Sequence, residues 1–513
     1  DGSRKASEMD KQLPASEMIG TLFTVASLLT FLYFYLERKQ SYWRRRGING
    51  PQGSFLLGNL RDSWFASIPR VHVLREWTRH YGKIYGFREG QRQILVTSDL
   101  EMTSEILMKK FDHFPTRMPF PLHRSNDNPK TPLVDATGER WKRLRTLGSF
   151  GFTNANLKQV RETVEDSALT VVNYLEQKRE KGEINIHTIF QEYTLDIIFK
   201  VALGKKEVEM FNNKYIDLLK DIFNSRINNY MQGFGAALPF MNKPVVGFLD
   251  FLGERSNLSF VVLMQELEKT VAARKKERDA GVESKSADFI DIYLDAEVDG
   301  SMSDIEGSRT MVLDEVVSQC MIMLLAGFDT TSNSLAYTAH FFANHPEVQE
   351  KAREEINRVC PGESVEYDSL AQLEYTTAVI KETLRHYPLA SFVVARECVK
   401  ATKVCGMEFK EGDMIMTDTW TMHMDKEIWG DDVEEFRPER WLQPSFPRHA
   451  FQSFGEGPRM CIGMRLAIME EKIMLAHLLK NFRVYKSENT NPIELVGDLT
   501  VSPTNVMVRL DRL

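Results

Sequence analysis

The sequence predicts a mainly α-helical protein with a small β portion, preceded by one transmembrane helix. Long stretches carry apolar residues at helical spacing, whereas strand-like runs are short and few. After residue 60 the composition does not shift, and neither repeats nor low-complexity runs divide the chain. For 513 residues, length alone suggests about three domains, but the uniform composition favours a single large one.

Residues 18–36, MIGTLFTVASLLTFLYFYL, carry no charge and predict the transmembrane helix. At about 1.5 Å per residue this helix spans about 28 Å, close to the hydrocarbon core of a bilayer. Five basic residues follow within 38–46, so the positive-inside rule predicts a lumenal tail over 1–17 and a cytosolic remainder. A cleaved signal peptide is less favoured, because the apolar run is long and no small-x-small cleavage signal follows it.

A linker is predicted over residues 37–58, where the basic cluster leads into GINGPQG with its three glycines and one proline. The domain proper then covers 59–513. Apolar residues at helical spacing predict helices over 156–181, 305–343 (interrupted near Gly327), 345–358 and 366–387. Strand-like runs occur at 83–87, 91–97, 403–410 and 413–416.

Charge and cysteine usage narrow the function classes. The net charge of −7 argues against a general nucleic-acid binder. The five cysteines are odd in number and scattered, which argues against a disulfide framework and suits a reducing compartment.

Cys461 lies in the stretch FGEGPRMCIG, residues 454–463, among three glycines, Pro458 and Arg459. Glycines let a flat surface approach the main chain, and a thiolate held there is able to ligate a haem iron. A buried free cysteine in a turn is the alternative. The order of residues, however, resembles the haem-binding loop of the cytochrome P450 superfamily, Phe-x-x-Gly-x-Arg-x-Cys-x-Gly, with every fixed position filled.

This resemblance implies the cytochrome P450 fold from about residue 50 to the end of the chain. It also implies haem b as the cofactor, with Cys461 as the metal ligand through its thiolate and Phe454 packed near the sulfur. Phrases such as FDHFPTR and GERWKRLR look most like the microsomal branch that contains the vertebrate family 3 drug- and steroid-metabolising enzymes and their invertebrate relatives.

The segment AGFDTT, residues 326–331, places an acid beside an alcohol next to two small residues. Such a pair is able to relay protons to bound dioxygen. A helix in which the threonine bonds back to a carbonyl is the alternative. The segment is similar to the family's oxygen-activation motif, which implies Asp329 and Thr330 as the catalytic proton relay and Ala326 as a haem contact.

Haem carries two propionates, which need cations. WKRLR, residues 141–145, places Trp141 and Arg145 at i and i+4, similar to the family's propionate contact. The resemblance implies three further haem contacts, Arg117, Arg396 and Arg459, since guanidinium groups suit carboxylates.

Glu382 and Arg385 lie one helical turn apart, which by itself indicates no more than an ion pair. In the family, the corresponding Glu-x-x-Arg forms a buried structural triad with a later arginine. The resemblance implies that this third member is Arg437 or Arg440 of FRPER.

The implied reaction is monooxygenation, in which one atom of O2 enters an organic substrate. No GxGxxG lies between a strand and a helix, so electrons must come from another protein. The resemblance implies NADPH–cytochrome P450 reductase, leaves cytochrome b5 open as a second donor, and implies the endoplasmic reticulum membrane with a cytosolic catalytic domain. Lys142, Arg143 and Arg459 are candidate docking residues.

Residues 228–260 are rich in phenylalanine, and the resemblance places there the substrate roof and a membrane contact. Phe120, Phe328 and a strand over 390–394 are further wall candidates. A lipophilic steroid, fatty acid or xenobiotic is therefore expected as substrate. Two alternatives stay open: a haem-thiolate isomerase or dehydratase acting on peroxides, against which Asp329 and Thr330 argue, and a non-catalytic membrane-bound haem protein.

Overall fold

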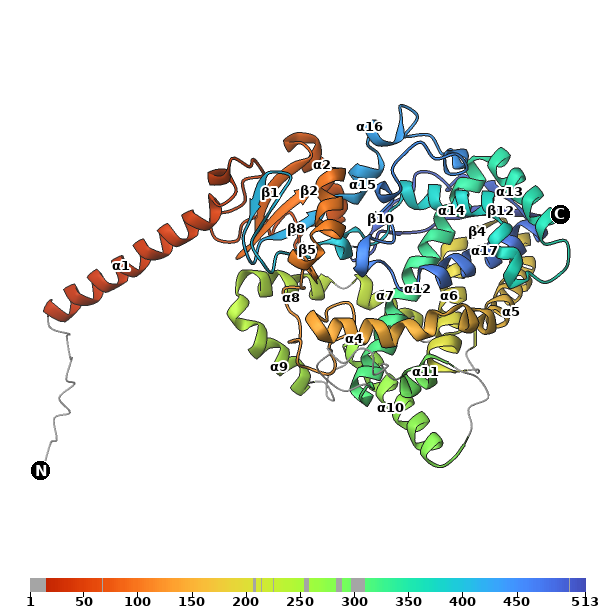
Figure 1. Ribbon diagram of the computed structural model, residues 1–513, viewed down its shortest axis with the longest axis horizontal. Coiled ribbons are helices and arrows are strands. Elements are labelled where there is room, and N and C mark those ends of the chain that lie inside the picture. The colour runs from red at the N-terminus through yellow and green to blue at the C-terminus, as the bar shows by residue number, and fades with distance from the viewer. Residues whose placement is uncertain are drawn as a thin grey trace, which may run out of the picture.

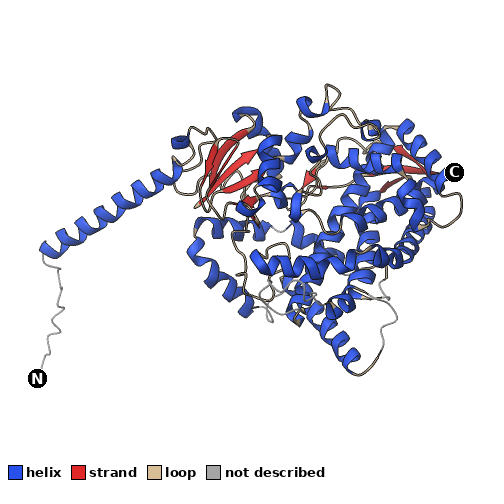
Figure 2. Ribbon diagram, in the orientation of Figure 1, coloured by secondary structure: helices blue, strands red, loops and turns tan. Residues whose placement is uncertain are grey.

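Helices make up most of the chain, and small sheets lie on either side of the helical body (Figures 1 and 2). The computed structural model describes residues 15–513 except 67, 206–208, 214, 225, 253–257, 283–287, 297–309 and 498. The helices are α1 Ala15–Gln40, α2 Arg70–Tyr81, α3 Leu100–Ser104, α4 Gly138–Ser149, α5 Asn154–Lys178, α6 Ile186–Leu203, α7 Tyr215–Asn224, α8 Arg226–Ala237, α9 Asn242–Leu252, α10 Ser259–Asp279, α11 Phe289–Asp295, α12 Leu313–Asn344, α13 Pro346–Val359, α14 Glu374–His386, α15 Thr419–His423, α16 Lys426–Trp429 and α17 Met464–Asn481. The mainly α fold class is confirmed.

The largest sheet brings together strands from distant parts of the chain. Its order is β1 Ile84–Glu89, β2 Arg92–Thr97, β8 Met414–Thr417, β5 Arg396–Glu397 and β3 Thr116–Arg117, with only the β2–β8 pair parallel. A second sheet has the order β4 Glu183–Asn185, β12 Met507–Arg512 and β9 Phe482–Lys486. Two hairpins complete the β portion: β6 Thr402–Val404 with β7 Met407–Phe409, and β10 Leu495–Val496 with β11 Ser502–Pro503.

Helix α12 crosses the centre of the domain and packs on α6, in which most side chains are buried. Glu315 accepts a hydrogen bond from the Val312 N–H and so caps the first turn of α12. The expected interruption near Gly327 is wrong, because α12 is continuous from Leu313 to Asn344. A Cβ at Gly327 would lie 3.0 Å from Ile198 Cδ1, so this glycine serves close packing against α6. Of the predicted range 305–343, residues 305–309 lie outside the described part.

Three further sequence expectations need correction. The helix predicted over 366–387 is a 3-10 helix, Tyr367–Gln372, followed by α14. The run 403–410 is the hairpin β6–β7, which turns at Cys405 and Gly406 with positive φ angles of 45° and 79°. The strand expected at 390–394 is a 3-10 helix, Ser391–Val394.

Helix α1 extends away from the rest of the molecule (Figure 1). Its stretch Ile19–Gln40 is apolar and long enough to cross a membrane, and its large side chains from Ile19 to Phe34 are exposed. The chain after it docks on the large sheet, where the Trp43 ring lies so close to Gly86 that a Cβ there would be 2.2 Å from the ring. The predicted tail over 1–17 falls mostly on residues 1–14, outside the described residues.

A buried charge cluster joins α14 to the segment that precedes the cysteine loop. Arg385 donates to both oxygens of Glu382, at 2.9 and 2.8 Å, and Arg440 Nε donates to Glu382 Oε1 at 2.9 Å. Arg440 is therefore the third side chain of the cluster. The candidate Arg437 reaches Glu382 only through its backbone N–H, at 3.1 Å, while its half-exposed side chain pairs with Asp432. Burial by itself would raise the pKa of Glu382, but the hydrogen bonds and charge of Arg385 outweigh it and lower the pKa below its usual value.

Replacing Glu382 should destabilise the fold, because Glu382→Gln leaves the buried Arg385 without its carboxylate and Arg440 with only Asp432 among the described carboxylates, 3.4 Å from its Nη1. The expected loss is about 3–5 kcal/mol of unfolding free energy in denaturant titrations at pH 7. Because the folded-state pKa is depressed, this difference should persist above the ordinary carboxyl pKa of about 4.3 and shrink only as the pH falls below it. Arg437→Ala is the control and should change stability by no more than about 0.5 kcal/mol. An equal effect of both changes would contradict the assignment of Arg440.

Candidate functional site

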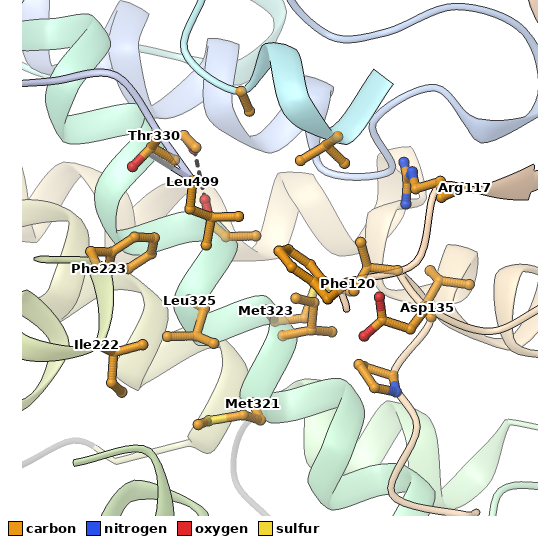
Figure 3. Close-up of a pocket in the computed structure, with 18 of the residues that line it drawn as sticks. Arg117, Phe120, Asp135, Ile222, Phe223, Met321, Met323, Leu325, Thr330 and Leu499 are labelled. Atoms are coloured by element: carbon orange, nitrogen blue, oxygen red, sulfur yellow. Dashed lines mark hydrogen bonds between the residues drawn. The ribbon is translucent and has the colours of Figure 1, made fainter. Parts of the chain in front are cut away.

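A cavity of about 680 Å³ lies between α12, the cysteine loop and the large sheet. Figure 3 shows Thr330 and Leu499 at one end of it, Arg117 and Asp135 at the other, and apolar side chains between them. Its size is within the range of about 300–1,000 Å³ typical of small-molecule sites. A mostly apolar cavity with charged groups at defined places suits a large, amphipathic cofactor and a lipophilic ligand.

Cys461 faces this cavity from a tight loop. Its N–H donates to Phe454 O at 2.8 Å, and the preceding residue donates to Gly457 O at 3.0 Å, which closes the turn. Gly457 has a φ of 72°, and a Cβ there would lie 2.2 Å from Leu107 O. The loop therefore requires glycine at this position, both for its conformation and for its contact with the short π-helix Glu105–Lys109.

The groups around the Cys461 thiol shift its pKa in opposite directions. Burial raises the pKa of the thiol, while the Gly463 and Met464 N–H groups and the charges of Arg117 and Arg145 act to lower it. Hydrogen bonds and cations favour the thiolate, which is the form that binds metal. Phe454, as expected, lies on the same loop and lines the cavity.

The large sheet aligns two of the expected arginines. In the β3–β5 pair, Arg117 lies directly opposite Arg396. Arg117 Nη2 donates to Arg459 O at 2.9 Å, and Arg459 donates from Nε to Pro115 O and from Nη2 to Ala136 O, both at 2.8 Å. The Arg459 guanidinium stacks over the Trp141 ring at 4.4 Å. The structure thus brings these side chains together at one end of the cavity.

The arginines of this cluster form no salt bridge with a described residue, although the Asp135 carboxyl group lies close enough to act electrostatically on Arg117 and Arg459. Among the described residues, none forms a salt bridge with Arg117, Arg145, Arg396 or Arg459. Burial lowers the pKa of Arg117 to about 10 and of Arg459 to about 9, and it lowers that of Arg396 well below its usual value. In the described part of the chain, Arg117 Nε, Arg396 Nε and Arg459 Nη1 are buried without a hydrogen-bond partner. Cations that line a cavity without a salt bridge suit a cofactor with two carboxylates, such as haem with its propionates.

Helix α12 contributes Ala326 and Thr330 to the cavity wall. The Thr330 hydroxyl donates to Ala326 O at 2.6 Å, which is the back-bonded arrangement that the sequence left open. Asp329 points elsewhere: it is buried, does not line the cavity, and accepts bonds from Asn333 and Ser502 at 2.8 and 2.9 Å. The expected acid–alcohol pair therefore does not share one face of the helix.

Of the residues expected in the cavity wall, some line the cavity and others do not. Phe120 lines the cavity, but Phe328 does not: it is fully buried and packs toward Phe223, which lines the cavity instead. Residues 228–260 contribute Phe260 and several smaller side chains to the wall. Four other phenylalanines of this range are exposed, at 44–74% of their full accessible surface: Phe234, Phe240, Phe248 and Phe251.

Sequence reasoning missed several cavity residues. Asp135 directs its carboxyl group into the cavity near Phe120 (Figure 3), and Leu499 and Thr500 approach from the C-terminal hairpin. Glu471 of α17 also lines the cavity and accepts from Ser334 at 2.8 Å; burial raises the pKa of Glu471 to about 8. None of these residues lies in a motif, and only the packing of distant segments brings them to the site.

Comparison with known proteins agrees with this geometry. Residues 49–509 match the cytochrome P450 family. The chain is 38% identical to CYP13A8 and to CYP13A3 of Caenorhabditis elegans, with 94% and 96% of the chain and 98% of each relative covered. It is 39% identical to CYP13A2 of the same organism, with 95% of the chain and 97% of that protein covered. The chain belongs to the cytochrome P450 family, whose members are typically haem-containing monooxygenases.

Proposed function

We propose that this cytochrome P450 is a membrane-tethered haem-thiolate monooxygenase that oxidises lipophilic substrates with electrons from NADPH through a reductase. The observation that carries the proposal is the Cys461 thiol, which faces a cavity whose other end holds arginines that form no salt bridge with a described residue. We further infer that the protein belongs to the family 3 branch with its invertebrate relatives. The sequence segments FDHFPTR, around Arg117, and GERWKRLR, around Trp141, support this inference.

Bound haem would supply thiolate-assisted cleavage of the O–O bond. Cys461 would hold the iron, and Arg117, Arg396, Arg459, Arg145 and Trp141 would hold the propionates. Arg459 and Arg117 are preorganised for this, because backbone carbonyls already orient their guanidinium groups. The remaining chemistry required of the protein is to exclude water and to deliver protons.

Proton delivery is the role proposed for Asp329 and Thr330. Burial raises the pKa of Asp329, despite hydrogen bonds from Thr500, Ser502 and Asn333 that act to lower it. A carboxyl group with a raised pKa is a better proton donor near neutral pH than an ordinary one. Thr330 places its hydroxyl on the cavity wall, where it would contact bound dioxygen.

The substrate is proposed to enter from the lipid. The exposed phenylalanines of α8 and α9, together with Phe240 between them, present apolar surface, and Phe260 lines the cavity. Apolar patches of this kind mark membrane or ligand contacts. With α1 as the anchor, this arrangement supports a cytosol-facing domain on the endoplasmic reticulum membrane.

Electrons would come from NADPH–cytochrome P450 reductase, with cytochrome b5 as an open second donor. Of the three docking candidates, only Lys142 has an exposed side chain. Arg143 forms a buried ion pair with Glu315, and Arg459 is buried beside the cavity. These two arginines are therefore excluded from a docking surface.

Replacing the thiolate ligand tests the cofactor assignment. Cys461→Ser should abolish the thiolate-type Soret band of the reduced CO complex, because serine offers no thiolate to the iron. Cys405→Ser is the matched control, since Cys405 lies at an exposed hairpin turn. Persistence of the thiolate band in Cys461→Ser would refute the assignment.

Removing the Thr330 hydroxyl should uncouple the reaction. Thr330→Ala is expected to lower product formed per NADPH by up to about 10²-fold, the lower end of what positioned proton transfer contributes, while Thr330→Ser retains most of it. The measurement is NADPH consumption with reductase against product formation. Equal coupling in Thr330→Ala would contradict the relay role. Peroxide rearrangement without NADPH would favour the isomerase alternative.

The substrate class is tested by ligand-induced shifts of the haem spectrum. Steroids, fatty acids and neutral drug-like lipophiles are expected to shift the Soret band, because they displace water from a mostly apolar cavity. Small hydrophilic molecules such as glucose serve as the comparison. A response to glucose without a response to lipophiles would contradict the proposed substrate class.

A further inference from the structure

The Asp329 carboxyl group is separated from the cavity by a hydroxyl from another part of the chain. Asp329 Oδ2 accepts hydrogen bonds from Thr500 Oγ1, from Ser502 Oγ at 2.9 Å and from Asn333 Nδ2 at 2.8 Å. All of these groups are buried. Of the three donors, only Thr500 also lines the cavity.

Thr500 belongs to the segment between β10 and β11 at the C-terminal end of the chain. Its neighbour Leu499 lies beside Thr330 at one end of the cavity (Figure 3). The segment is held by backbone bonds, since the Val501 N–H donates to Leu389 O at 2.8 Å, and by Tyr337 of α12, whose hydroxyl donates to Val501 O at 3.1 Å. The position of the Thr500 hydroxyl between Asp329 and the cavity is therefore built into the packing.

The donors around Asp329 are oriented by a second layer. Asn333 Oδ1 lies 2.8 Å from His187 Nε2, and since an amide oxygen only accepts, this nitrogen of His187 carries the proton. Burial lowers the pKa of His187 to about 4, so the ring is neutral near pH 7. The amide group of Asn333 is thereby turned to donate to both Asp329 and Ser502, the latter at 2.8 Å. No described residue bonds Asp329 Oδ1, so the printed contacts of this carboxyl group all fall on Oδ2, the oxygen that Thr500 contacts.

Thr330, the alcohol next to Asp329 in sequence, does not contact it. Its hydroxyl group donates a hydrogen bond to Ala326 O on the cavity side of α12. The alcohol that binds the acid in space is Thr500, 171 residues away.

We propose that Thr500 is a relay residue that carries the proton of Asp329 into the cavity. In this step the Thr500 O–H turns from Asp329 Oδ2 toward the cavity and gives its proton to an acceptor there, while Thr500 Oγ1 takes the proton that the carboxyl group holds on Oδ2. One O–H bond forms as another breaks, no electrons move, and a solvent proton restores the acid. This role rests on the proposed monooxygenase function and adds to it the connection that Thr330 does not supply.

Three substitutions test the relay in the full-length holoenzyme. Thr500→Val removes the hydroxyl at nearly constant volume, and Thr500→Ser keeps it. Thr504→Val is the matched control, because Thr504 lies in the same C-terminal segment, is exposed and bonds only Glu494 O, at 3.2 Å. A reduced CO spectrum of thiolate type and an unchanged melting temperature show that haem and fold are intact in each variant.

The first readout does not depend on turnover. The infrared carbonyl band of the protonated Asp329 carboxyl, identified by its loss in Asp329→Asn, should shift in Thr500→Val and keep its wild-type position in Thr504→Val. An unshifted band in Thr500→Val would overturn the contact between the two groups.

The second readout is the fate of oxygen when NADPH is oxidised with reductase and no added substrate, so that hydrogen peroxide and water are the products. Thr500→Val should slow the proton-dependent formation of water by about tenfold or more, since positioned proton transfer contributes about 10²–10⁴-fold in total. The peroxide fraction and the solvent deuterium isotope effect should therefore rise, and Thr500→Ser should restore both. Wild-type values in Thr500→Val would overturn the relay.

The two readouts separate the relay from the proposed function. If the wild-type protein binds haem through its thiolate but fails to oxidise NADPH with reductase, the monooxygenase proposal fails. The relay proposal then fails with it, whatever the infrared band shows about the Asp329–Thr500 contact. If the wild-type protein turns over normally and Thr500→Val does too, only the relay fails.

Discussion

The gathering of four guanidinium groups around one cavity, those of Arg396 and Arg459 buried and those of Arg117 and Arg145 partly buried, is the constraint on which the site depends. Desolvating a cation costs several kcal/mol unless an anion accompanies it, and in the described part of the chain no carboxylate pairs with these arginines. The backbone carbonyls of Pro115 and Ala136 satisfy only part of the Arg459 guanidinium. An apolar ligand would leave most of this positive charge uncompensated, whereas a cofactor with two carboxylates would neutralise much of it. The arginine cluster is therefore suited to a cofactor that carries carboxylates.

The large sheet and the loop that carries Cys461 together position the arginine cluster. Arg117 and Arg396 are neighbours because two very short strands pair in register, and Arg459 reaches them because the loop that carries Cys461 passes beside β3. The same loop requires glycine at 457 for its contact with the main chain at Leu107. Behind α14, Glu382 with Arg385 and Arg440 holds the segment leading into the loop. The arginines that line the cavity and the Glu382 cluster are therefore separate, and only the first group faces that cavity.

Much of the fold was predictable, because helix periodicity and the proline and glycine signals are local. The helices near 156–181 and 345–358, the strands near 84–97 and the apolar N-terminal helix follow from residues within each segment. The predicted break at Gly327 failed because a glycine within a helix pattern indicates either a kink or close packing, and only the position of Ile198 on α6 decides between them. The single helix expected over 366–387 is divided at Leu373, a fully buried residue with a ψ of 70°, into a 3-10 helix and α14.

The sequence by itself identified Cys461, the apolar N-terminal helix, the cationic residues and the protein family. Short motifs with local spacing carry all of these. Tertiary structure alone decided which arginine completes the Glu382 cluster, that Phe328 faces away from the cavity, and that Asp329 meets Thr500 rather than Thr330. The physical reason is helical geometry. Adjacent residues on a helix point about 100° apart, so Asp329 and Thr330 have different surroundings, and the partner of each is set by whichever distant segment packs there.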